Sequence, residues 1–443
     1  MKIMLSDHFT YKKLLRFTFP TVIMMVFISV YGVVDGFFVS NYAGKTAFAA
    51  INLIMPFVMV LGGMGFMIGT GGTALVSKVM GEGDPERANR LFSEMILFTV
   101  IFGAVLSAVG VAVMRPVSVL LGATPEMIDD CVLYGRIVVG FTAAFMLQNV
   151  FQSFFIAAEK PKLGLAATVA AGLTNMVLDA LFVGGFNWGI AGAAVATGIS
   201  QCVGSIFPLI YFAAQNKSRL RLSFAMPEIK PVLASCANGS SELMSNISAS
   251  IVGMLYNFQL MRLLGEDGVS AYGVMMYVQF IFTAVFFGFS TGSAPIISYH
   301  FGADNPSEVK NMLMKSVVFM EAAGAVLTAA AIAMSPLLAD IFVGYDVQLK
   351  ELTEHAFRIY CLHFVLAGFN IFASSFFTAL NNGAVSAAIS FIRTLVFQVA
   401  AVLLLPLVLG ENGIWCSVLV ADAGATVLSV IFLYKKRYEY GYA

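Results

Sequence analysis

Apolar residues occur along the chain in long runs separated by short polar segments, and this pattern predicts membrane-spanning helices. A helix needs about 20 consecutive apolar residues to cross the hydrocarbon core of a bilayer. Twelve runs reach that length. They cover residues 13–38, 46–76, 91–114, 131–158, 163–186, 189–213, 232–261, 268–298, 312–338, 356–380, 384–409 and 413–434. Because twelve is even, both ends of the chain are expected on one side of the membrane.

The Lys and Arg residues between the runs indicate which side this is, because positive charges are retained in cytoplasmic loops. Eighteen Lys and Arg residues lie in the two terminal segments and in the loops on their side, against four in the opposite loops. Those four are Lys45, Arg115, Arg262 and Lys350. We therefore expect both termini in the cytoplasm and the protein in the plasma (inner) membrane.

The longest polar interruption, residues 215–230, follows the sixth run and divides the chain into two halves. We expect an N-terminal six-helix bundle over 1–214, a cytoplasmic linker over 215–230 and a C-terminal six-helix bundle over 231–443. Six crossings per half give the two bundles the same orientation, related by an axis along the membrane normal.

The two halves also resemble each other in sequence. SKVMGEGDP at 77–85 aligns with SYHFGADNP at 298–306 at an offset of 221, and the same offset pairs Gly44 with Gly265. Further along, Gly189-Ile190 aligns with Gly413-Ile414. This repetition predicts an all-α membrane protein with an internal duplication.

Composition excludes several other classes of protein. The chain has 443 residues, of which 59% are AVILMFWYC and only 11% are charged, whereas soluble domains have about 25% charged residues. Lys and Arg together number 25, as do Asp and Glu, so no net charge favours nucleic acid. The five Cys form no CxxC pair and the four His form no HExxH motif, so we expect neither an enzyme nor a bound cofactor.

A few charged side chains interrupt the apolar runs, and such residues are candidates for function because burying them in a membrane is costly. Asp35, Asp179 and Thr197 each lie roughly 8–12 Å inside the outer boundary, given a rise of about 1.5 Å per residue. Asn175 is four residues before Asp179 and shares its helix face. The four residues place oxygen ligands in one layer.

Two carboxylates in a low-dielectric pocket cannot both stay ionised without compensation, so the layer predicts retention of a proton or binding of a small cation. The alternative is that Asp35 and Asp179 only join helices by hydrogen bonds. Glu242, within the seventh run, is a possible second acid; it could instead line a wet cavity without taking part in coupling.

Other residues are candidates for structural roles or for a substrate cavity. Arg393 is expected to pair with Asp422 or Glu321, and His363 to serve packing or hydrogen bonding. Pro20 lies in the same helix as Asp35 and permits that helix to bend. Met side chains adapt to varied apolar ligands, which makes the Met-rich first two helices a candidate cavity wall. The candidate cavity residues are Met24, Met55, Met59, Asn149, Gln152 and Asn370.

Taken together, these features resemble the MATE family (multidrug and toxic compound extrusion) over essentially the whole chain, and within it the branch of DinF-like and MepA-like exporters. The resemblance rests on the two six-helix halves and on PTVIMMVFISVYGVVDGFFVS from Pro20 to Ser40, together with the loops at 77–85 and 298–306 and NMVLD at 175–179. It implies two bundles arranged as a V, and ion-coupled antiport that exports small amphipathic, cationic compounds by alternating access.

The resemblance also assigns roles to residues. The cation site of the family is similar to Asp35, Asn175, Asp179 and Thr197, with Pro20 as the hinge. Glu242 looks like the acid that the family carries in helix seven, whereas Asn370 stands where some members have an acid. Na⁺ and H⁺ both remain possible coupling ions, and we expect a monomer surrounded by lipid.

The alternative function is that of a lipid-linked precursor flippase of the same superfamily. Such a protein would need several cationic side chains in its cavity to bind pyrophosphate, and only Arg136, Arg358 and Arg393 are available.

Overall fold

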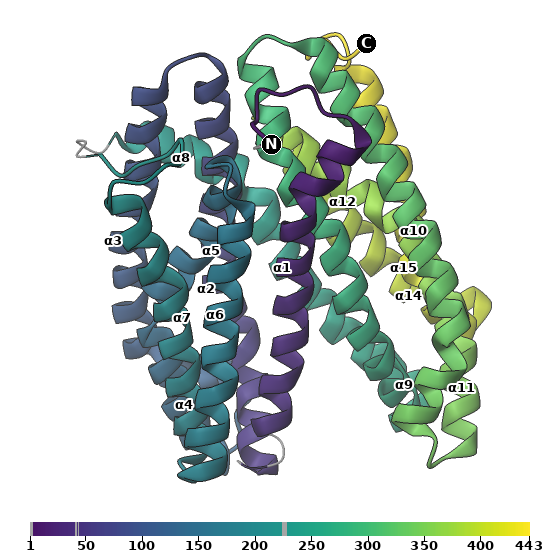
Figure 1. The fold of residues 1–443 in the computed structure, drawn as a ribbon. Helices are drawn as coiled ribbons and strands as arrows, with labels where there is room; N and C mark the ends of the chain where they lie inside the picture. Colours follow the sequence, from purple (N-terminus) through teal and green to yellow (C-terminus); the bar gives the residue numbers. More distant parts are fainter. Residues whose placement is uncertain (1–2, 40–41, 43, 224–227) are drawn as a thin grey trace.

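The computed structural model describes residues 3–39, 42, 44–223 and 228–443, and this part of the chain folds into helices joined by short connections (Figure 1). The first half contains α1 (Tyr11–Phe38), α2 (Lys45–Gly81), α3 (Pro85–Leu120), α4 (Ile128–Gly140), α5 (Thr142–Ala157), α6 (Pro161–Asp179), the π-helical turn η2 (Ala180–Gly185) and α7 (Gly189–Ala213).

The second half contains the helices that follow the linker. They are α8 (Ile229–Asn238), α9 (Ser240–Gly302), α10 (Pro306–Val343), α11 (Val347–Tyr360), η3 (Cys361–His363), α12 (Phe364–Ala379), α13 (Gly383–Phe391), the π-helical turn η4 (Ile392–Phe397), α14 (Gln398–Leu409) and α15 (Glu411–Lys436).

Ten helices in the described residues are long and apolar enough to cross a membrane, and the bent pair α4–α5, which turns by 52°, makes an eleventh. α9 accounts for two crossings, because its 63 residues are interrupted at Gly265, where φ is +66°. With α9 counted as two, the described residues contain twelve segments long and apolar enough to cross a membrane, the number that the sequence predicts.

The duplication is visible in the connections between helices. Asp84 caps α3 by accepting a hydrogen bond from the Arg87 N–H, and Asn305 caps α10 by accepting one from the Glu308 N–H. Each cap is followed by a proline in the first turn, where proline is well tolerated. The two loops predicted to be equivalent thus start their helices in the same way.

Residues with positive φ recur at the same interval. The pairs, each separated by 221 or 222 residues, are Gly44 and Gly265, Gly83 and Asp304, Glu159 and Asn381, and Gly189 and Gly410. The counterpart of Gly189 in backbone conformation is therefore Gly410, three residues before the Gly413 with which the sequence aligns it. Left-handed turns occupy equivalent positions in the two halves.

Two predicted helices are broken. The run at 131–158 bends at Phe141 between α4 and α5, and the run at 232–261 breaks at Gly239 between α8 and α9. A Cβ atom on Gly239 would lie 2.0 Å from the carbonyl oxygen of Met67 in α2, so α8 packs there backbone to backbone. Glu242 consequently lies in the first turn of α9 rather than about ten residues into a continuous helix.

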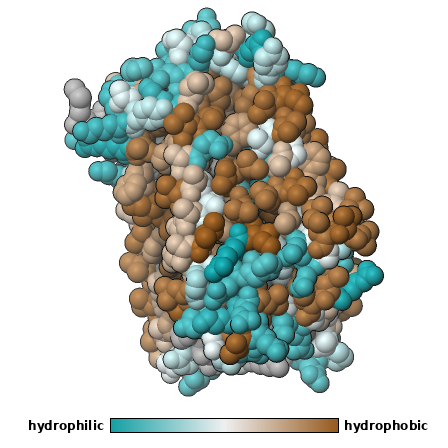
Figure 2. All heavy atoms as spheres, turned by 90° about the vertical axis from the view of Figure 1, so that its right-hand side faces the viewer, coloured by the Kyte–Doolittle hydropathy of each residue, from teal (hydrophilic) through white to brown (hydrophobic). Residues whose placement is uncertain are grey.

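The two sets of helices lie close together at the end that carries both termini and diverge toward the opposite end, giving a V (Figure 1). Figure 2 shows a broad hydrophobic band on the face of the C-terminal half, between more hydrophilic ends. This band is the surface expected to contact lipid.

Candidate functional site

Asp35 and Asp179 come from two helices that pack against each other, α1 and α6. Their carboxyl groups are close enough to interact directly, and the Asn175 side chain also interacts with Asp35. Asp179 is fully buried, and Asn175 is only 2% exposed. The structure thus brings together three of the four residues that the sequence places in one layer.

Asp179 also marks a change in its helix. It ends the regular part of α6, and the π-helical turn η2 begins at the next residue. Such turns often occur at functional sites, because they disturb the regular spacing of side chains around a helix.

The oxygen atoms of this site have few donors around them. Asp35 Oδ1, both carboxyl oxygens of Asp179 and Asn175 Oδ1 are sealed from solvent and receive no hydrogen bond while both acids are ionised. A buried acceptor without a donor costs free energy, about 1–3 kcal/mol and more for a charged group. A proton or a small hard cation is the kind of ligand that relieves this cost.

Tyr134 of α4 belongs to the same cluster and is missed by the sequence reasoning. Its ring is 2% exposed, and its hydroxyl group lies near enough to both Asp35 and Asp179 to interact with them electrostatically. Tyr31, one turn before Asp35 in α1, also lies near that carboxyl group. Nothing in the spacing of Tyr134 links it to the acids, because it comes from a separate helix.

The fourth predicted member, Thr197, is half-buried in α7, the helix that packs against α6. Its carbonyl oxygen accepts a hydrogen bond from the Ser200 hydroxyl, at 2.8 Å. Its role in ion binding stays a prediction.

Glu242 lies away from this cluster, in a cavity of about 20 Å³ between the two halves. That volume holds about one water molecule. The lining is almost entirely hydroxyl-bearing: Thr70, Thr73, Ser153, Thr291, Ser375 and Thr378 accompany Glu242, with Ala74 and Ala294. Thr70 and Thr291 occupy equivalent positions of the repeat, so this polar cavity lies where the two halves meet.

The second half contains a different cluster, in which the charges are paired. Arg393 Nε lies 2.7 Å from Asp422 Oδ1, and His363 Nδ1 lies 3.1 Å from Asp422 Oδ2. Asn370 donates to the carbonyl oxygen of Asp422 at 2.9 Å. Of the two partners predicted for Arg393, the structure thus shows Asp422 rather than Glu321, and His363 takes part in hydrogen bonding as expected.

The candidate cavity residues lie in varied surroundings. Met24 is buried in α1, Met55 is half-buried and Met59 is exposed, both in α2. Asn149 donates to the carbonyl oxygen of Gly62 at 3.0 Å, whereas Gln152 Oε1 is buried without a partner. Contact of these residues with a substrate stays a prediction, as does bending of α1 at Pro20.

Comparison with known proteins assigns the chain to a family. The sequence model of the MatE family matches residues 20–181 and 243–403, one segment in each half. Among characterised proteins, the chain is 22% identical over 431 residues to "Multidrug export protein MepA" of Staphylococcus haemolyticus, covering 96% of this chain and 94% of that protein. It is 19% identical over 428 residues to the protein of the same name from Staphylococcus aureus, with the same coverage.

Solved structures show the same fold. A MATE crystal structure in complex with MaL6 superimposes with a TM-score of 0.92 at 20% identity, over 98% of both chains. An outward-facing multidrug resistance MATE transporter of the MOP superfamily gives the same TM-score and identity, also over 98% of both chains. Since the family model covers most of the chain in two segments, and the fold agrees from end to end, the protein belongs to the MatE family of multi-pass membrane transporters and is not an enzyme.

Proposed function

We propose that the protein is a multidrug efflux antiporter that exports small amphipathic, cationic compounds from the cytoplasm in exchange for Na⁺ or H⁺. The observation that carries this proposal is the set of four buried oxygen atoms without donors on Asp35, Asn175 and Asp179. A pair of acids held this way responds to an ion by changing its charge, which a merely structural contact does not require.

The named relatives support the substrate class. The Staphylococcus proteins to which this chain is similar over nearly its whole length are named multidrug export proteins. Promiscuous binding needs adaptable apolar walls, and the Met residues of α1 and α2 supply such side chains. Lys and Arg are concentrated at the end with the termini, which supports a cytoplasmic location for that end.

The coupling follows from which form of the transporter each ligand prefers. An ion shifts the equilibrium between inward-open and outward-open forms only by its differential affinity for the two. Asp35 and Asp179 come from helices that pack on each other, so binding between them changes the contact of α1 with α6. Na⁺ would be bound by Asp35, Asn175, Asp179 and Thr197, and H⁺ by the two acids. In the described residues no three His, Cys, Asp or Glu side chains cluster, so neutral oxygens must complete a cation site.

Efflux from energised vesicles, with the pH and sodium gradients imposed separately, tests the proposal. A fluorescent cation should leave wild-type vesicles only when one of the two gradients is present, and Asp35→Asn should abolish that response. The proposal fails if Asp35→Asn exports at the wild-type rate and still follows the gradient. A current in planar bilayers without any coupling ion would indicate a channel instead.

The flippase alternative is less well supported by the surroundings of the three arginines. Arg393 is paired with Asp422, Arg358 lies 3.4 Å from Glu354, and Arg136 is exposed. They do not form the joint cationic site that a pyrophosphate group would need.

A further inference from the structure

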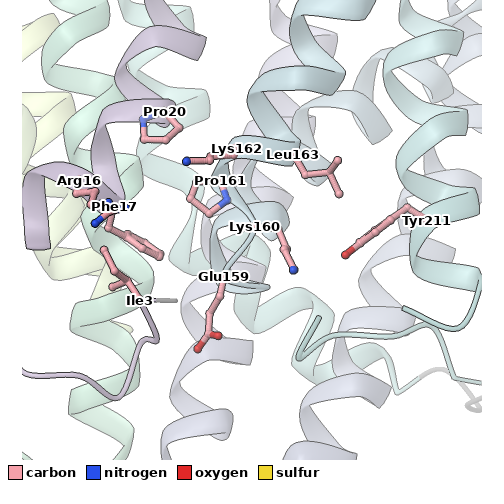
Figure 3. Close-up of a pocket in the computed structure, with 10 residues that line it drawn as sticks. All are labelled: Ile3, Arg16, Phe17, Pro20, Glu159, Lys160, Pro161, Lys162, Leu163 and Tyr211. Atoms are coloured by element: carbon pink, nitrogen blue, oxygen red, sulfur yellow. The ribbon is translucent and has the colours of Figure 1, made fainter. Parts of the chain in front are cut away.

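A pocket of about 630 Å³ opens beside α1 at the end of the molecule that carries the termini (Figure 3). α1 contributes Arg16, Phe17 and Pro20, and the connection into α6 contributes Lys160 and Lys162. Tyr211 of α7 closes another side. The pocket is separate from the Asp35 cluster, which lies much further along α1. Of the residues that line it, only Pro20, the predicted hinge of α1, has a role in the proposed antiport.

The polar part of the pocket is cationic. Among the described residues, no acidic side chain lies within ion-pair distance of Arg16, Lys160 or Lys162. Glu159 also lines the pocket, but its Oε1 atom is 3.0 Å from Arg219 Nε and accepts a hydrogen bond from the Leu5 N–H. Figure 3 shows Lys162 extending toward α1, while Lys160 points down between Glu159 and Tyr211.

The remaining wall is apolar. Phe17, Pro20, Leu163 and Tyr211 supply it, while Phe207 and Ile210 expose their side chains beside Tyr211 on α7. Exposed aromatic and aliphatic residues on a spanning helix face the hydrocarbon of the bilayer. Arg16 lies near the amino end of α1, and Lys160 and Lys162 lie at the amino end of α6. Helix ends are where a spanning helix meets the lipid headgroups. An occupant with both a negative group and a long apolar chain would match both parts.

We propose that this pocket binds an anionic phospholipid of the leaflet next to the termini. Arg16, Lys160 and Lys162 contact the phosphate and the anionic headgroup, and an acyl chain lies along Phe17, Pro20, Leu163 and Tyr211. Basic pockets between spanning helices at the membrane surface are suited to acidic lipids, since each nearby cation adds to the attraction. α6 has no side-chain cap at its amino end, so the positive end of the helix dipole strengthens the attraction for an anionic headgroup.

Native mass spectrometry of the full-length protein in detergent can test this. Phosphatidylglycerol should remain bound where phosphatidylcholine does not, and the triple variant R16Q/K160Q/K162Q should bind phosphatidylglycerol about ten- to one-hundred-fold more weakly. The matched control R90Q/K230Q/K435Q removes three exposed cations outside the pocket and should bind as the wild type does. Equal binding by the wild type and the first triple variant would overturn the proposal.

Competition distinguishes a lipid from a free anion. Inorganic phosphate and glycerophosphoglycerol, which lack acyl chains, should not displace phosphatidylglycerol at equal concentration, and displacement by either would overturn the lipid assignment. If the triple variant does not fold, photo-crosslinking of the wild type with a diazirine-bearing phosphatidylglycerol decides. Labelling within 16–20 or 160–163 is expected, and labelling only elsewhere would refute the site.

Discussion

Gly81 and Gly302 meet where the two halves touch, and neither position has room for a side chain. A Cβ atom on Gly81 would lie 2.0 Å from the carbonyl oxygen of Tyr299, and one on Gly302 would lie 2.0 Å from that of Lys78. The two glycines are 221 residues apart and equivalent in the repeat, so α2 and α9 contact each other reciprocally. Small residues allow membrane helices this close approach.

Gly302→Ala should therefore force the halves apart at the end with the termini. Overpacking costs about 1–3 kcal/mol, which corresponds to a shift of about 5- to 150-fold away from this closed contact. Distances between spin labels on Glu86 and Ser307, both exposed, would report the shift. Gly273→Ala is the matched control, because nothing lies within 4 Å of a Cβ atom at that position of α9. An unchanged distance distribution in Gly302→Ala would contradict the argument.

Asp179→Asn should separate function from stability. The substitution removes an acid whose two oxygens receive no hydrogen bond while it is ionised, so the melting temperature should stay the same or rise. Ion-driven efflux should fall by about tenfold or more, because the site loses its change of charge. Thermal unfolding and vesicle efflux on the same preparation would show both effects. A large loss of stability with normal coupling would instead assign Asp179 to helix joining.

Asp422→Asn, unlike Asp179→Asn, should destabilise the protein, since Asp422 is fully buried and pairs with both Arg393 and His363. Removing one partner of a buried ion pair leaves the other uncompensated and costs about 3–5 kcal/mol. We expect a clear drop in melting temperature. The double variant R393M/D422L should recover part of it, whereas a double variant no more stable than Asp422→Asn would argue against the pair as the cause.

Glu308→Ala should release the segment that precedes α1. Glu308, at the start of α10, accepts hydrogen bonds from the Phe9 N–H at 2.8 Å and from Asn311 at 2.7 Å, and it lies 2.7 Å from His8. Loss of these contacts should cost about 1–3 kcal/mol locally, so hydrogen exchange at the Phe9 amide should quicken by about 5- to 150-fold. Glu86→Ala, at an exposed position in the first turn of α3, should leave that exchange unchanged. Equal exchange in both variants would mean that other contacts hold the segment.

The sequence by itself determined the number of crossings, the duplication and the family. Each crossing depends on the residues of one segment, because a run of about 20 apolar residues is more stable inside a bilayer than in water whatever its neighbours are. The alignment of Gly44 with Gly265 belongs here too, because both residues can be read from the sequence; glycine permits the positive φ that the structure shows at both. Asp35 and Asp179 could be placed at one depth because rise per residue is constant along a helix.

Only the tertiary structure decided which side chains meet across helices. Tyr134 joins the two acids from a helix with no sequence relation to them, and Gly239 breaks a predicted helix because α2 leaves no space beside it. The cationic pocket at Arg16, Lys160 and Lys162 draws on two distant segments in the same way. The physical reason is that such contacts depend on how helices are rotated and cross, and these are properties of the packed molecule rather than of any one segment.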